Sequence, residues 1–81
     1  MTFGRDSSNT LKFPDDYKGI SRKHATLQLQ NGVITLTDIS STEIVLKSTR
    51  APIPKNTPVR LEAGDVFYMG DSTNRFEIVY R

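Results

Sequence analysis

The sequence predicts an all-β domain built as a sandwich of two sheets, and three observations lead to this prediction. Apolar and polar residues alternate in several short segments, and no stretch carries apolar residues at helical spacing for three turns. Turn-forming residues recur roughly every eight to twelve positions, a spacing typical of sandwiches. The length of 81 residues suits one domain with a thin core. We therefore expect a single domain over residues 1–81.

The first segments indicate two short strands followed by a loop. Met1–Arg5 and Thr10–Phe13 have strand character and are separated by the polar turn at residues 6–9. Residues 13–19 should form a loop, because Pro14 cannot donate a ladder hydrogen bond and the acidic residues and glycine beside it favour turns.

The clearest prediction is a hairpin over residues 25–38. In Ala25–Gln30 the apolar side chains fall on one face and the polar ones on the other, which is the pattern of a half-buried strand. Val33–Asp38 resumes the alternation after Asn31-Gly32, the residue pair that most strongly favours a two-residue type I′ turn. Asn31-Gly32 is therefore interpreted as a turn.

After a polar loop at residues 38–43, the central segments predict one buried strand and one irregular stretch. Ile44–Leu46 is a short apolar run of the kind found in buried strands. Residues 50–58 hold three of the four prolines, so we expect irregular or edge structure there.

The last third predicts a strand at Val59–Leu61, a tight turn at residues 62–65, and a second hairpin formed by Val66–Met69 and Phe76–Tyr80. The residues expected to supply most of the core of the sandwich are Leu27, Leu29, Ile34, Leu36, Val66, Phe67, Phe76, Ile78 and Tyr80.

Composition excludes several classes of function. The chain has no cysteine and one histidine, so we expect no disulfide, no metal site and no cofactor. No apolar run approaches the roughly 18 residues of a membrane span, and no secretory signal is recognisable, so we expect a cytoplasmic protein with no membrane partner. The net charge of +2 is too small for a duplex-binding face, so we expect no nucleic-acid partner.

Two short motifs carry the chemistry of an anion site. Phe3-Gly4-Arg5 places a guanidinium at the end of an extended segment, and Ile20–Ala25 joins Ser21, Arg22 and the single histidine, His24, to the start of a strand. A small hydrolase using Ser21 and His24 is disfavoured, because no orienting acid and no glycine-rich nucleophile elbow accompany them. The motifs suit holding a phosphate better than breaking a bond, and we expect no enzymatic activity.

The order of motifs along the chain resembles that of the forkhead-associated (FHA) domain. The segments that carry the resemblance are Gly4-Arg5, Ser21–Ala25, Asp38–Thr42, Leu61–Asp65 and a closing Phe-x-Ile-x-Tyr strand. The resemblance covers nearly all of the chain. It implies a β-sandwich of the SMAD/FHA-like type whose loops at one end bind phosphothreonine peptides, that is, a signalling module for protein–protein interaction.

The resemblance also assigns roles to single residues. It implies that Arg5 meets the phosphate and the peptide backbone, that the Ser21 hydroxyl donates to a phosphate oxygen, and that Arg22 reaches the same anion. Ser41 or Thr42 would close the far side of the site. Gly4 and His24 would support the loops without touching the ligand.

The chain departs from the family pattern in two places. The loop reads Ser41-Thr42-Glu43 where the family usually has an asparagine and a glycine that grip the peptide backbone, and neither Thr42 nor Glu43 offers the paired donor and acceptor of an amide. Only Met1-Thr2-Phe3 precede Gly4, so we expect that either the first strand of the family has been trimmed away or an edge of the sheet is left open. The alternative function is therefore a phosphate-independent scaffold that forms a homodimer through this exposed edge.

Overall fold

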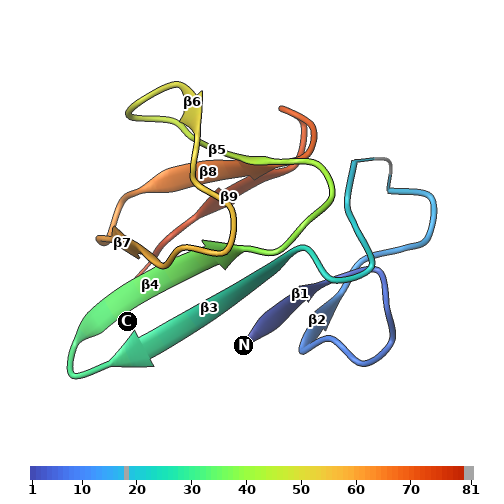
Figure 1. The fold of residues 1–81 in the computed structure, drawn as a ribbon, viewed down its shortest axis with the longest axis horizontal. Helices are drawn as coiled ribbons and strands as arrows, with labels where there is room; N and C mark the ends of the chain where they lie inside the picture. The colour runs from blue at the N-terminus through green and yellow to red at the C-terminus, as the bar shows by residue number, and fades with distance from the viewer. Residues whose placement is uncertain (18, 80–81) are drawn as a thin grey trace.

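The computed structural model describes residues 1–17 and 19–79, and all regular secondary structure in that part of the chain is β (Figure 1). The strands are β1 Thr2–Gly4, β2 Leu11–Lys12, β3 Ala25–Gln30, β4 Val33–Asp38, β5 Ile44–Leu46, β6 Ala51–Pro52, β7 Val59–Leu61, β8 Val66–Met69 and β9 Arg75–Glu77.

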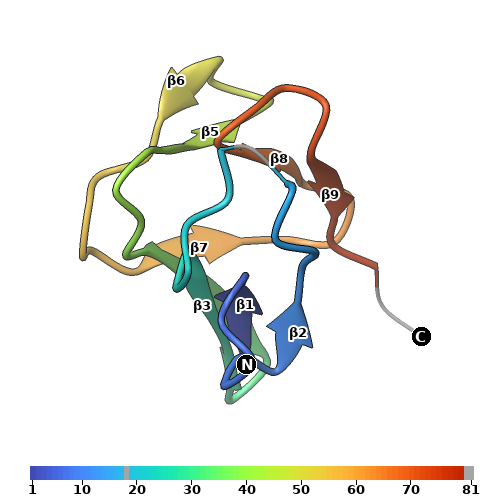
Figure 2. The same cartoon turned by 90° about the vertical axis from the view of Figure 1, so that its right-hand side faces the viewer.

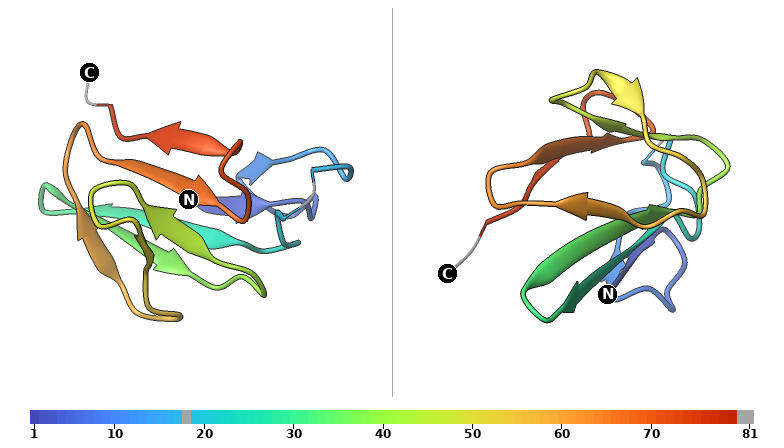
Figure 3. Two further views of the ribbon diagram at one scale, coloured as in Figure 1. Left: turned by 90° about the horizontal axis from the view of Figure 1, so that it is seen from above. Right: turned by 60° about the vertical axis from the view of Figure 1, so that its left-hand side comes forward.

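The strands form two sheets that face each other, which confirms the predicted sandwich. The first sheet has five strands in the order β2-β1-β3-β4-β7, and the second has four in the order β6-β5-β8-β9. Figure 3 shows the two layers from two further sides. Most pairs are antiparallel, so the connections lie at the two ends of the sandwich.

The hairpin of β3 and β4 forms in the predicted register. Ala25 pairs with Asp38 and Gln30 with Val33, so that Asn31 and Gly32 are the two residues of the turn. Their φ angles are 54° and 78°, as a type I′ turn requires at both central positions.

The pairing of β1 with β2 was not predicted. The two strands lie parallel, with Phe3 opposite Leu11 and Gly4 opposite Lys12. Threonine side chains help to hold the pair, because the Thr10 backbone N–H donates to Thr2 Oγ1 (2.9 Å) and the Thr2 N–H donates to Thr10 Oγ1 (3.1 Å). As a result β1 is covered on both sides, and the open edges of the described sheets are β2, β7, β6 and β9.

The second sheet follows the sequence expectations except at its last strand. Ile44–Leu46 is a strand in the middle of the sheet, and the proline-rich stretch contributes only the edge strand β6. The last strand was expected over residues 76–80, but β9 ends at Glu77, because Ile78 instead exchanges backbone hydrogen bonds with the turn at Gly64 and Asp65. Tyr80 lies outside the described residues.

The core lies between the sheets and extends under the loops at one end. Of the predicted core residues, Ile34, Leu36, Val66, Phe67 and Ile78 are buried, and Leu27 and Phe76 pack against them. Ile44 and Ala25 are also buried, as expected from the buried strand and from the apolar face predicted for their segments, whereas the sequence did not reveal the burial of Phe3, Phe13, Ile20, Ile53, Leu61 and Met69. Full burial of a side chain such as Leu36 stabilises the fold by about 1.5–3 kcal/mol.

The prediction that Leu29 belongs to the core is wrong, since its exposed fraction is 67%. Leu29 does face inward, because it is opposite the buried Ile34 in the hairpin. However, the hairpin extends past the cover of the second sheet there, and an open groove of about 480 Å³ separates Leu29 from Ile78 and Val79.

Three connections gather at one end of the sandwich, on the right in Figure 1 and facing the viewer in Figure 2. They are the segment that leads into β3, the β4–β5 connection and the β8–β9 connection. No helix in the described part of the chain is long and apolar enough to cross a membrane.

Candidate functional site

Backbone hydrogen bonds join the two basic motifs of the sequence side by side. The Arg5 N–H donates to the Ser21 carbonyl oxygen (3.1 Å), and the Asp6 N–H donates to the Arg22 carbonyl oxygen (3.0 Å). The His24 N–H donates to the Phe3 carbonyl oxygen (2.8 Å). The end of β1 and the segment before β3 are thereby held as one ladder, and Arg5 lies next to Ser21.

Arg5 is held by its Nε, which donates to the Ile20 carbonyl oxygen. The guanidinium is half-buried, and its two terminal nitrogens have no hydrogen-bond partner among the described residues. Those nitrogens form the planar fork that binds carboxylates and phosphates in a bidentate way. The structure therefore holds the base of this side chain and leaves its fork available for an anion.

Position 4 requires glycine because the backbone segment at Arg22 passes too close to leave room for a side chain. A Cβ built on Gly4 would lie 2.1 Å from the Arg22 carbonyl oxygen. The amide of Asn9 donates to the same oxygen (2.6 Å) and to the Asp6 carbonyl oxygen (2.9 Å). Asn9 closes the turn after Arg5, a role that the sequence reading missed because a polar turn residue carries no specific signal.

Ser21 and Ser41 contact each other across two loops. The Ser41 N–H donates to Ser21 Oγ, and the two hydroxyl oxygens are also 3.1 Å apart. Because Ser21 Oγ accepts a backbone hydrogen bond, its own proton remains available to be donated. The contact between the two hydroxyls uses one of their protons, so the pair has one further O–H to donate, on the segment that adjoins Arg5.

Thr42 is exposed but its hydroxyl is already engaged, since Oγ1 donates to the Gly19 carbonyl oxygen (3.0 Å). The contact ties the β4–β5 connection to the segment before β3. In this conformation the Thr42 hydroxyl oxygen can still accept a hydrogen bond from a ligand, but its proton is already donated to Gly19.

His24 is completely buried and joins the same loops from below. Its Nδ1 accepts from the Ser21 backbone N–H (3.0 Å), and its Nε2 contacts the Glu43 carbonyl oxygen (3.0 Å). A carbonyl oxygen only accepts, so Nε2 carries the proton in the neutral ring. The imidazole therefore contacts the backbone of Ser21 and not its hydroxyl, which leaves Ser21 without a general base.

Burial lowers the pKa of His24 below its ordinary value, although the hydrogen bond to Glu43 and the charge of Asp38 act in the opposite direction. Protonation would place a second N–H against the Ser21 N–H. Because the unfolded chain binds the proton more readily, the stability that His24 contributes is fully present above its unfolded pKa of about 6.5 and is lost as the pH falls below it.

We accordingly expect the free energy of unfolding to fall as the pH is lowered from 7 to 5, a window set by the ordinary histidine pKa of about 6.5. Urea denaturation at a series of pH values measures it. The variant His24→Gln should be less stable and should lose this dependence, and an identical pH profile for both proteins would contradict the assignment.

Lys55 and Asp38 clamp the loop that carries Ser41 and Thr42. Asp38 is fully buried, its Oδ1 accepts from the backbone N–H (2.8 Å) and hydroxyl (2.6 Å) of Ser40, and its Oδ2 lies 3.3 Å from Lys55 Nζ. The Lys55 ammonium also donates to the carbonyl oxygens of Ser40 and Thr42. Lys55 lies in the proline-rich stretch, and no sequence signal linked it to the site.

The variant Lys55→Met should lower the free energy of unfolding by about 1–3 kcal/mol, because it leaves the buried Asp38 carboxylate without a counter-charge. Lys55→Arg keeps the positive charge, so it should lower the free energy of unfolding by less than Lys55→Met does. Urea denaturation measures both, and Lys47→Met, which removes a lysine from the outer face of the second sheet, is the matched control. Equal effects of Lys55→Met and Lys47→Met would contradict the clamp.

The side chains of Arg5 and Arg22 line one hollow of about 460 Å³, together with Lys12, Asp6 and Asp15. The hydrogen bonds from Ser8 hold the pKa of Asp6 below its ordinary value, so this carboxylate stays ionised beside the arginines. Ser21, Ser41 and Thr42 do not line the hollow. The structure thus brings Arg5 and Arg22 together at one hollow, and it places Ser21, Ser41 and Thr42 on adjoining, hydrogen-bonded segments outside the lining of that hollow.

Within residues 1–17 and 19–79 the structure has no group of three or more side chains of the metal-ligating kind.

Comparison with known proteins agrees with this architecture. The family model for the FHA domain matches residues 1–70 of the chain. No curated protein matches the sequence.

Several solved structures share the fold. The N-terminal FHA domain of S. cerevisiae Rad53p, in complex with a phosphothreonine peptide, is 26% identical with a TM-score of 0.75, and the alignment covers 91% of this chain and 60% of that one. An engineered FHA domain with a Myc-pTBD peptide is 28% identical (TM-score 0.73, covering 89% of this chain and 56% of that one). The FhaA FHA domain, complexed with the intracellular domain of Rv3910, is 27% identical (TM-score 0.69, 85% and 69%).

The chain therefore spans about 60% of the Rad53p domain structure that it resembles. The family match covers most of its residues, and the two-sheet sandwich is shared with domains of the same family. The chain belongs to the FHA-domain family.

Proposed function

We propose that this chain is a phosphothreonine-peptide binding module that mediates phosphorylation-dependent protein–protein interaction and has no enzymatic activity. Arg5, Ser21 and Arg22 hold the phosphate in this proposal, Ser41 or Thr42 closes the far side, and Gly4 and His24 support the loops. The partner is a protein or peptide that carries phosphothreonine, and we place the module in the cytoplasm.

The observation that supports the proposal most strongly is that the Arg5 backbone is hydrogen-bonded to Ser21, which in turn contacts Ser41. The Arg5 fork has no partner among the described residues, and the Ser21–Ser41 pair on the adjoining segment has one further O–H to donate. A phosphothreonine carries nearly two negative charges and three acceptor oxygens. Hydrogen bonds to such a charged group contribute about 1.5–3 kcal/mol each, so a few of them supply much of a micromolar affinity of about 8 kcal/mol.

Calorimetric titration with pairs of peptides from a phosphothreonine library tests the proposal. Each pair contains the same sequence with and without the phosphate, and a third peptide carries phosphoserine. We expect some phosphothreonine peptides to bind with dissociation constants in the micromolar range and their unphosphorylated twins not to bind. If no phosphorylated peptide binds better than its twin, the proposal is wrong.

A homodimer formed through an exposed edge is the second candidate, in which the chain acts as a phosphate-independent scaffold. The observation in its favour is the groove of about 480 Å³ beside the edge strand β9. Met1, Leu29 and Val79 line it, and their exposed fractions are 58%, 67% and 65%. Exposed apolar side chains next to an open strand edge invite pairing with another chain.

Light scattering over a wide range of protein concentration separates the two candidates. A dimer through this groove should dissociate in the variant Leu29→Lys, whereas Leu11→Lys, on the edge strand β2 of the first sheet and outside the lining of the groove, should leave it intact. A mass that stays monomeric at every concentration would count against the scaffold and would leave the phosphopeptide proposal standing.

A further inference from the structure

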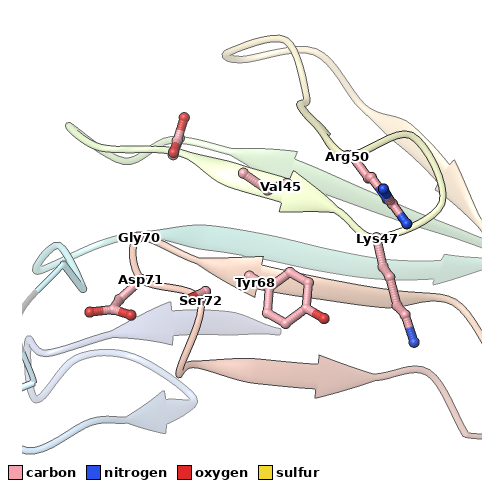
Figure 4. Close-up of a pocket in the computed structure, with 8 residues that line it drawn as sticks. Val45, Lys47, Arg50, Tyr68, Gly70, Asp71 and Ser72 are labelled. Atoms are coloured by element: carbon pink, nitrogen blue, oxygen red, sulfur yellow. The ribbon is translucent and has the colours of Figure 1, made fainter.

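A second hollow of about 450 Å³ lies on the outer face of the second sheet (Figure 4). Its lining comprises Glu43, Val45, Lys47, Arg50, Tyr68, Gly70, Asp71 and Ser72.

The floor of this hollow follows from the alternation along β5 and β8. Val45 pairs with Tyr68, and on either side of them Ile44 pairs with Met69 and Leu46 with Phe67. The flanking pairs point into the core, where Ile44 and Met69 are fully buried, so Val45 and Tyr68 point outward. The result is an apolar floor with one aromatic ring, which is half-exposed in the described structure.

The far end of the hollow is positively charged. Lys47 follows β5, Arg50 lies in the turn before β6, and both line this end of the hollow (Figure 4). Arg50 has a φ angle of 54°, a conformation that favours glycine or asparagine, yet a long cationic side chain occupies the position. Neither cation forms an ion pair with another described residue.

The near end is continuous with the candidate phosphopeptide site. Glu43 follows Thr42 directly, and the Gly70 N–H donates to the Glu43 carbonyl oxygen (2.8 Å). Asp71 and Glu43 make this entrance negative, so the two ends of the hollow favour opposite charges. From Thr42 to Lys47 the chain advances five residues, which corresponds to roughly 16 Å of extended strand.

We propose that this hollow binds an acidic segment of the same phosphopeptide, placed about five residues from the phosphothreonine, with its carboxylates on Lys47 and Arg50. The inference rests on the proposed function, because the phosphothreonine anchors the peptide at the neighbouring loops. An extended peptide of about five residues spans the distance from the loops to the two cations. The negative entrance disfavours acidic residues next to the phosphothreonine, so the anion is recognised only at the far end.

Fluorescence polarisation with four peptides tests the inference. One is a phosphothreonine core, two carry a Glu-Glu pair about five residues before or after the phosphothreonine, and the fourth carries Lys-Lys at the same place as the tighter-binding acidic pair. We expect one of the two acidic peptides to bind about 3- to 10-fold more tightly than the core, as two exposed ion pairs of modest strength allow. The lysine peptide should not gain, and the advantage should shrink at high salt.

The variant Arg50→Gln should remove most of this advantage and leave the affinity for the core peptide unchanged. Arg60→Gln is the matched control, because it removes the same charge from an exposed arginine on β7 of the other sheet. Equal binding of the core and both acidic peptides, or an equal loss in both variants, would overturn the inference while the proposed function stands. If the phosphorylated core peptide itself did not bind, both the inference and the proposed function would be wrong.

Discussion

The variant Arg5→Ala should bind phosphothreonine peptides about 10- to 100-fold more weakly than the wild type, because one or two charge-assisted hydrogen bonds to the phosphate are lost. Calorimetric titration with a phosphothreonine peptide that the wild type binds measures the effect. Arg5→Lys keeps the charge but loses both the planar fork and the Nε contact with Ile20, so its affinity should lie between the other two.

Thermal and urea denaturation provide the control for this result. The ladder hydrogen bond from the Arg5 backbone to Ser21 survives the substitution, so the free energy of unfolding should change by no more than about 1 kcal/mol. Arg60→Ala, which removes an exposed arginine far along the first sheet, should leave binding unchanged. Retained affinity in Arg5→Ala would show that Arg5 does not contact the phosphate.

The variant Gly70→Ala should lower the free energy of unfolding by about 2–5 kcal/mol, the largest effect on stability that we predict. Gly70 has a φ angle of 71°, and a Cβ at this position would lie 1.9 Å from the carbonyl oxygen of Gly19. The added methyl group therefore combines a strained backbone with a clash against another backbone. Urea denaturation measures the loss.

Gly64 supplies the matched control, because an alanine there would have a strained backbone but no steric clash. Its φ angle is 92°, and nothing lies within 4 Å of a Cβ built there. Gly64→Ala should therefore cost only about 1–2 kcal/mol. If the two variants were equally destabilised, the close packing of Gly19 on Gly70 would not contribute to the fold.

Local signals were sufficient to predict the β3–β4 hairpin and its turn. Alternation set the faces of both strands, and Asn31-Gly32 set the register, since the turn type requires positive φ at both positions. The all-β class and the β5 strand also followed from pattern. These features depend on neighbouring residues, which the sequence shows directly.

Tertiary context explains the parts that the sequence did not reveal. Phe13 and Ile53 lie in proline-containing loops, yet both are buried, because the loops fold over the ends of the sheets. Phe13 reaches the second sheet and contacts Phe76 edge to face at 5.6 Å. In contrast, Leu29 has the right pattern for the core but extends beyond the sheet that would cover it.

The sequence predicted the motifs of the candidate site but not the residues whose hydrogen bonds hold its loops in place. The order of the motifs, through the resemblance to the FHA domain, pointed to Arg5 and Ser21, and the structure places them on adjacent, hydrogen-bonded segments. Asn9 joins these two segments, and Lys55 and Gly70 hold the loop that carries Ser41 and Thr42. All three bond to backbone oxygens, and such contacts leave no trace in the sequence. Phosphate binding by the five predicted residues stays a prediction; they are Arg5, Ser21, Arg22, Ser41 and Thr42.

An NMR titration with a phosphothreonine peptide tests the central proposal most directly, with the unphosphorylated twin as the control. We predict that the backbone amides of Gly4-Arg5, Ser21-Arg22 and Ser41-Thr42 shift together and saturate with one dissociation constant, while those of Asn31-Gly32 do not move. The twin should cause no such shifts. Shifts that ignore the phosphate, or that leave these three segments unchanged, would contradict the proposal that the loops form a phosphothreonine site.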